Sequence, residues 1–199
     1  MKKILTCIFL IKLCFVCGQN REVIYPEGIY TTFEGFINKK PNVENSISAK
    51  QGKNIILTTF RIKDGDGNKI KNAFAVSDGQ NLYVRTNAML KHLTNFEFNK
   101  PNATNKDYSL AHLVNNNYSY FEVFFQDKST RTWGIGKVYL TGIIYDNSTQ
   151  MFTFLDTIKD VEAVLDDRKI DDRNEENLRV NGQNIDIARK AILRLFKND

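Results

Sequence analysis

The protein has little of the residues on which small exported domains and catalytic sites commonly depend. Its 199 residues include three cysteines, three prolines, one tryptophan and two histidines. Cys7, Cys14 and Cys17 all lie within the first eighteen residues. A chain without that segment has no disulfide, so its apolar core must stabilise it unaided. His92 and His112 lie in unlike contexts, which leaves few side chains able to exchange a proton near neutral pH.

A hydrophobic run long enough to cross a bilayer is also absent. Lys2 and Lys3 precede an apolar stretch from Ile4 to Ile11, which resumes after Lys12. A transmembrane helix needs about 20 apolar residues, whereas the apolar part of a secretory signal peptide has about 7–15. We therefore predict that residues 1–18 are a cleaved signal peptide and that the protein is exported, either to the periplasm or out of the cell.

Side-chain size indicates where the signal peptide is cut. Cleavage after Gly18 places small residues at the −1 and −3 positions, Gly18 and Val16, and makes Gln19 the new N-terminus. A lipoprotein anchor would need a small residue directly before Cys14 or Cys17, and neither cysteine has one. Lipidation is thus disfavoured, and an uncleaved anchor is the remaining alternative.

Strong charge of one sign is missing as well. Loss of the three lysines in the leader lowers the formal net charge from +5 to +2. Basic and acidic residues are mixed along the chain, whereas nucleic-acid binding is typically marked by a clustered basic excess. We expect the partner to be a protein or an envelope component and not a nucleic acid. Membrane contact stays open, without a transmembrane segment in the mature chain.

Alternating apolar residues predict an antiparallel meander over residues 54–85. A loop at residues 64–68 places Ile62 opposite Ile70, and a turn at residues 77–79 places Phe74 opposite Leu82. Further strands are expected at about residues 108–114, 118–126, 132–145 and 151–155. Apolar residues alternate on both faces of the strand at 118–126, which predicts a strand that is covered on both sides.

Helices are predicted near both ends of the mature chain. Thr31 with Glu34 is a capping-box pattern before a short helix, and Thr157 with Asp160 is a second one. A final amphipathic helix begins near Asn184. The expected fold is α+β: a mainly antiparallel sheet, either open or a partly closed barrel, with C-terminal helices packed on it. Residues 19–199 form one β-rich domain whose last third, 157–199, is helical.

No motif for catalysis, a cofactor or a metal is present, and none of these is predicted. The Asp64–Asn68 loop resembles the start of a calcium-binding loop. Lys69 and Ala75, however, occupy the positions where such a loop needs glycine and a bidentate glutamate. Asp and Gly are also the residues of tight hairpin turns, so a turn is the favoured interpretation.

Aromatic residues on the strands are the candidates for a ligand or partner surface: Phe74, Phe121, Trp133 and Tyr139. An alternative function follows from them, because inward aromatics in a small barrel hold an apolar ligand in lipocalin-like carriers. The Gly-x-Trp signature of lipocalins is absent near the mature N-terminus. A second alternative is an unrecognised hydrolase, which would bring His92 or His112 together with carboxylates in a cleft.

The segment Gly28–Pro41 resembles the opening of a family of uncharacterised exported bacterial proteins. In that family a Gly-x-Tyr strand leads into a Ser/Thr-Phe-Glu-x-Phe helix and an Asn-Lys-x-Pro stop. The strand around Phe74–Tyr83, with its Asp-Gly turn, and the helical end of the chain are similar too. The resemblance implies an envelope location and no specific activity. We therefore expect an exported, non-enzymatic envelope protein that binds a protein or an envelope component.

Overall fold

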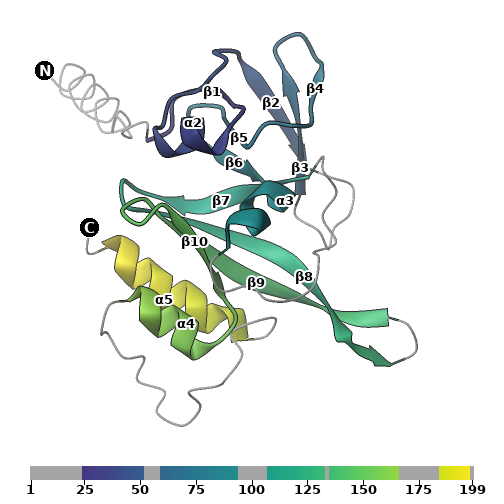
Figure 1. The fold of residues 1–199 in the computed structure, drawn as a ribbon, viewed down its shortest axis with the longest axis vertical. Helices are drawn as coiled ribbons and strands as arrows, with labels where there is room; N and C mark the ends of the chain where they lie inside the picture. The colour runs from purple at the N-terminus through teal and green to yellow at the C-terminus, as the bar shows by residue number, and fades with distance from the viewer. Residues whose placement is uncertain (1–23, 52–58, 94–106, 133–134, 166–183, 198–199) are drawn as a thin grey trace, which may run out of the picture.

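The computed structural model describes residues 24–51, 59–93, 107–132, 135–165 and 184–197. Within these residues, ten strands form one antiparallel sheet and a few helices flank it (Figure 1). The predicted α+β class is confirmed. The sheet is open: β1 (Gly28–Tyr30) and β10 (Met151–Leu155) lie at the two ends of its main path, so the partly closed arrangement is not adopted.

The main path of the sheet runs β1-β5-β6-β7-β8-β9-β10. Its inner strands are β5 (Ala75–Ser77), β6 (Leu82–Arg85), β7 (Tyr108–Val114), β8 (Tyr118–Thr132) and β9 (Ile135–Asp146). The first half of β7 pairs with β6 and the second half pairs with β8. The sheet changes direction at β7, where His112 is an extra residue between the pairs Ala111–Phe121 and Leu113–Tyr120. Such a bulge bends a strand and increases its twist.

Three further strands branch from β7. They are β2 (Ile47–Gln51), β3 (Thr59–Asp64) and β4 (Lys69–Ile70), and β3 pairs with β2, β4 and β7. Ile62 lies opposite Ile70, as the loop length predicted. The predicted three-stranded meander is nevertheless wrong, because its middle strand is divided: β4 ends at Ile70, whereas β5 begins at Ala75 and pairs with β1 and β6.

The register of the β5–β6 hairpin also differs from the prediction. Ser77 lies opposite Leu82 and Ala75 opposite Val84, so Phe74 does not pair with Leu82. The cause is the turn chemistry at Asp78, whose Oδ1 accepts hydrogen bonds from the backbone N–H of Gln80 and Asn81 at 2.9 and 2.6 Å. This aspartate closes a longer turn than the three-residue glycine turn that the sequence suggested.

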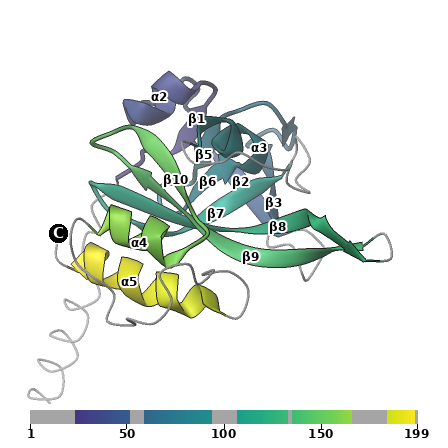
Figure 2. The same ribbon diagram turned by 60° about the horizontal axis from the view of Figure 1, so that its bottom comes forward.

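Three apolar cores lie between the layers of the fold. The central core is formed by β1, β5 and β6 on one side and by β8, β9 and β10 on the other, and the short helices add the buried residues Phe36, Ala88 and Met89. A second core lies between the outer face of the first strands and the β2–β4 branch. The third lies between the opposite face of β8–β10 and the C-terminal helices (Figure 2).

The short helices form largely where local signals predicted them. Helix α2 (Phe33–Ile37) is capped by Thr32 and not Thr31: Thr32 Oγ1 accepts from the Gly35 N–H at 3.1 Å. Helix α3 (Thr86–Met89) continues into the 3₁₀ turn η1 (Leu90–His92).

The two C-terminal helices are confirmed. Helix α4 (Ile158–Val164) begins with the predicted capping box, in which Thr157 and Asp160 bond to each other's backbone N–H. Helix α5 (Ile185–Lys197) follows and packs beside α4 under the sheet (Figure 2). No helix within the described residues is long and apolar enough to cross a bilayer.

Residues 119–123 of β8 are buried on both faces, as the pattern predicted for this part of the strand. Phe121 and Val123 lie in the central core, whereas Tyr120 lies in the core beneath α4 and α5. Gly142 of β9 lies against that tyrosine: a Cβ added there would be 2.9 Å from Tyr120 Cε2 and 3.0 Å from its hydroxyl. The glycine therefore permits the Tyr120 ring to pack directly on the neighbouring strand.

The opening segment Gly28–Pro41 folds back on itself. Gly28 has φ of +144°, and a Cβ there would lie 2.7 Å from both Pro41 Cβ and the Val43 carbonyl oxygen. Ile29 and Val43 are joined by a backbone hydrogen bond of 2.8 Å. Only glycine fits this close approach with positive φ, which gives a physical reason for glycine at the start of the segment.

Candidate functional site

Two of the four aromatic residues predicted to form a ligand or partner surface are buried in the central core. Phe74 is 4% exposed and Phe121 is 0% exposed. The Phe74 ring lies 5.1 Å from the Phe36 ring, and the Phe121 ring lies 6.2 Å from that of Phe152. Because protein side chains already pack against both rings, neither contributes to a surface that meets a partner.

The other predicted site residues lie outside what the structure describes. Gly18 and Gln19, at the expected cleavage site, precede the first described residue, and Trp133 falls in the gap between β8 and β9. Tyr139 is described in its backbone alone, which pairs with Phe125. The predictions for these four residues therefore stay predictions.

The two histidines lie on opposite faces of the β8–β10 part of the sheet. The His92 ring stacks on Phe33, with 4.1 Å between the ring centroids, beside the central core. Its pKa is lowered, mainly by partial burial and to a smaller extent by the positive charge of Lys91. His112 is exposed at the β7 bulge, with its ring 6.5 Å from that of Tyr120 on the helix-covered face. The structure does not bring the two together.

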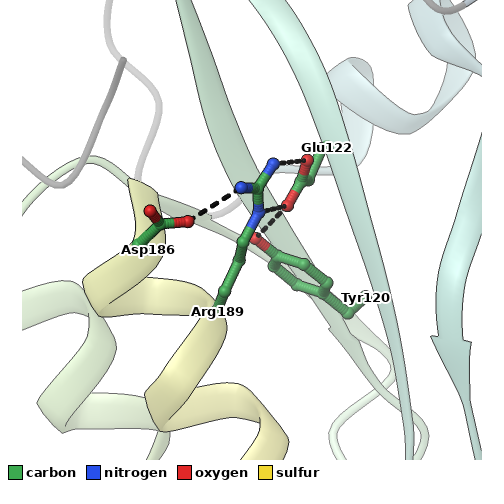
Figure 3. Close-up of polar contacts among 4 residues, drawn as sticks. All are labelled: Tyr120, Glu122, Asp186 and Arg189. Atoms are coloured by element: carbon green, nitrogen blue, oxygen red, sulfur yellow. Dashed lines mark hydrogen bonds and ion pairs between the residues drawn. The ribbon is translucent and has the colours of Figure 1, made fainter. Parts of the chain in front are cut away.

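A cluster of polar side chains joins the sheet to α5 (Figure 3). Glu122, only 8% exposed, accepts hydrogen bonds from Arg189 Nε at 2.6 Å and Arg189 Nη2 at 2.8 Å, one on each carboxylate oxygen. The Tyr120 hydroxyl donates to the same carboxylate at 3.2 Å. Arg189 Nη1 extends outward to Asp186 at 2.8 Å. We call Tyr120, Glu122, Asp186 and Arg189 the Glu122 network.

The electrostatics of this network keep its carboxylate ionised. Burial by itself would raise the pKa of Glu122, but the Arg189 hydrogen bonds and the His112 and Arg189 charges outweigh burial and lower it. The pKa of Tyr120 is raised, first by burial and then by the Glu122 charge. The phenol is therefore a neutral donor at neutral pH and the carboxylate is an acceptor.

This arrangement suits a structural anchor better than a catalytic group. A general base works best with a pKa near the operating pH. The pKa of Glu122 is instead lowered, away from neutrality, and its carboxylate already accepts three hydrogen bonds, one from Tyr120 and two from Arg189. A bidentate arginine–carboxylate pair fixes geometry as well as charge. We conclude that the network fixes α5 on the sheet. His112 acts on Glu122 through its charge, and the hydrolase alternative stays a prediction.

The Asp64–Asn68 loop is a hairpin turn, as favoured from the sequence. Asp64 Oδ1 accepts from the Asn68 backbone N–H at 2.8 Å, and the Gly67 N–H donates to the Asp64 carbonyl at 2.9 Å. Among the described residues, no group of three or more His, Cys, Asp or Glu side chains could hold a metal ion.

Sequence reasoning missed Glu122 and Arg189, although a signal was present. Glu122 stands between Phe121 and Val123 on a strand whose neighbours are apolar on both faces, and a charged residue is seldom buried without a partner. Asp186 and Arg189 are three residues apart on an amphipathic helix that was expected to dock on the sheet. Pairing the lone strand carboxylate with that helix arginine would have identified the contact.

A second feature at this end of the sheet is a two-stranded ribbon. β8 pairs with β7 no further than Phe121, and β9 pairs with β10 no further than Gly142. Among the described strands, residues 123–132 and 135–141 therefore pair only with each other, and we call them the ribbon. Val123 and Thr141 at its base are still buried in the body, and the rest of the ribbon extends well beyond the body in both views (Figures 1 and 2).

Comparison of the chain with protein-family models, with curated proteins and with solved structures found no match.

Proposed function

We propose that the mature chain is an exported, non-enzymatic protein of the bacterial envelope that binds a protein or an envelope component through the ribbon. The observation that carries this proposal is the projection of the ribbon from a body whose three cores are formed by its own packed side chains. The leader at residues 1–18 and the resemblance of the Gly28–Pro41 segment support the location.

Backbone chemistry supports the ribbon as the binding element. Along residues 123–132 and 135–141, the described strands form ladder hydrogen bonds only with each other. Beyond the buried Val123 and Thr141, the outer edge of each strand thus presents N–H and C=O groups to which an extended segment can add. Natural sheets usually cover or shorten such edges, so a long ribbon that keeps both is a reasonable place for a partner.

Site-specific photocrosslinking tests the binding surface. A crosslinking amino acid is placed at position 126 or 127 of the ribbon, in cells that export the protein, so that neighbouring positions sample both faces of the strand. The matched control is position 193, where Leu193 of α5 is 44% exposed. We expect one adduct of defined mass from the ribbon positions and none from the control. No ribbon adduct, or the same adduct from position 193, would contradict the proposal.

Export is tested separately by the intact mass of the protein recovered outside the cytosol. We expect the mass of residues 19–199, lowered by the loss of ammonia if Gln19 has cyclised. A cytosolic species with the mass of the full chain would refute the location without bearing on the ribbon.

A further inference from the structure

Two buried hydroxyl groups in the central core make no hydrogen bond within the described part of the chain. They are Ser119 Oγ on β8 and Tyr145 Oη on β9, and both residues are 0% exposed. Leaving such a group unpaired in an apolar interior costs about 1–3 kcal/mol. Two of them in one place therefore require an explanation.

The two groups come from paired residues on one face of the sheet. Ser119 and Tyr145 are direct cross-strand partners, so their side chains leave the same face of the sheet and enter the same core. The Tyr145 ring packs between Phe36 and Phe152, at 4.9 and 4.6 Å. Burial raises the pKa of Tyr145 to about 12, with a further contribution from Asp146, so its hydroxyl keeps its proton at neutral pH.

A third hydroxyl, that of Tyr25, completes the cluster. Its ring stacks on Phe36 at 5.2 Å, and its pKa is raised by burial first and by Tyr145 next. The Ser119 hydroxyl approaches this phenol and partly offsets that rise, without the geometry of a hydrogen bond. Tyr25 donates its own proton outward, to Asn147 Oδ1 at 3.4 Å, so its oxygen is left as an acceptor.

We infer that these three residues form an internal binding site for one ordered water molecule. The donor and acceptor counts match: water accepts from the hydroxyls of Ser119 and Tyr145 and donates to the Tyr25 oxygen. Buried water typically makes about three hydrogen bonds to polar groups that are otherwise unsatisfied. The site lies where β8, β9 and the segment before β1 meet, so the water links the N-terminal segment to the sheet. The inference is independent of the proposed function.

The sign of a stability change tests the site. If water bridges the hydroxyls, Tyr145→Phe loses a hydrogen bond, and we expect the folding equilibrium constant to fall about fivefold. If the hydroxyl is merely unpaired, the same change is neutral or stabilising, because it removes a buried unsatisfied group. Tyr30→Phe is the control: Tyr30 is equally buried, but its hydroxyl donates to the Pro26 carbonyl at 2.7 Å, so its loss is destabilising under either account.

A crystal structure of the mature protein that resolves ordered water gives the second readout. Density within hydrogen-bonding distance of Ser119 Oγ, Tyr145 Oη and Tyr25 Oη supports the site. So does a Ser119→Ala/Tyr145→Phe double variant that loses less stability than the two single changes together, since both hydroxyls would share one water. A direct hydrogen bond between Ser119 and Tyr145 would overturn the inference, as would a Tyr145→Phe variant that is unchanged or more stable.

Discussion

Glu122 provides the polar attachment of α5 to the sheet. Its carboxylate is 8% exposed and takes three hydrogen bonds, two of them from Arg189. We expect Glu122→Gln to lower the free energy of unfolding by about 2 kcal/mol, because charge-assisted bonds are lost and the guanidinium keeps only the exposed Asp186 as a counter-charge. Urea denaturation of the variant measures this. Asp186→Asn is the control: Asp186 is 68% exposed, so a change within about 0.5 kcal/mol is expected. Equal losses in both variants would refute this role for Glu122.

The same carboxylate gives the protein a pH dependence of known sign. The pKa of Glu122 is lowered in the folded state, below its ordinary value of 4.5, so the unfolded chain takes up the proton at higher pH. The stabilisation is therefore complete above about pH 4.5 and is lost as the pH falls through the lower, folded-state pKa. We expect the stability difference between wild type and Glu122→Gln to shrink from pH 7 to pH 3. A constant difference across that range would contradict the assignment.

Gly142 sets how closely Tyr120 can pack. A Cβ at this position would lie 2.9 Å from Tyr120 Cε2 and 3.2 Å from Leu155 Cδ1, and the tyrosine is held by its bond to Glu122. We expect Gly142→Ala to destabilise the protein by about 1–3 kcal/mol, measured by thermal or urea unfolding. In a Tyr120→Ala background most of that cost should disappear. If it persists there, the clash is not with the ring.

At the scale of elements, α5 is fixed through one face. Ile192 is 0% exposed in the core beneath the sheet, whereas its neighbour Leu193 is 44% exposed. We expect Ile192→Ala to cost about 3 kcal/mol and Leu193→Ala less than about 0.5 kcal/mol. The adjacent pair has nearly the same helix propensity and deleted volume, so urea denaturation of the two variants isolates burial. Similar losses would mean that this packing of α5 on the sheet is wrong.

Elements built from local signals could be predicted from the sequence, and long-range pairings could not. The Thr157–Asp160 capping box and the Ile62–Ile70 hairpin depend on residues close in the chain, and both were predicted correctly. The β5–β6 register was wrong because the side chain of Asp78, and not Gly79, determines the turn.

The candidate site shows the same division. Glu122 and Arg189 are 67 residues apart in sequence. The alternation of apolar residues along β8 does not indicate which residue of a distant helix pairs with Glu122. The burial of Phe74 and Phe121 likewise depends on which strands face each other across the central core. Apolar alternation shows that a residue is covered, but it does not distinguish protein from ligand as the covering group.

In the whole molecule, shared strands couple the three cores. On β8, Phe121 lies in the central core and Tyr120 lies in the core between the sheet and the C-terminal helices. On β6, Val84 lies in the central core and Tyr83 lies in the core against the β2–β4 branch. A loss of packing on one face therefore disturbs the strand that supports the next core. We expect the body of the protein to unfold as one cooperative unit, as single domains of this size usually do.

The ribbon stands outside that coupling, because beyond Gln126 and Val138 its residues pair only with one another. Replacing residues 127–137 with Asn-Gly closes the hairpin at the Gln126–Val138 pair with a turn suited to two strands. Since an isolated two-stranded ribbon is marginally stable by itself, we expect the free energy of unfolding to change by less than about 1 kcal/mol. Crosslinking from position 126 should nevertheless be lost, because the strand edges to which the partner binds have been removed. If instead the shortened protein loses its cooperative urea transition, the ribbon is part of the folding unit and its projection is not available for binding.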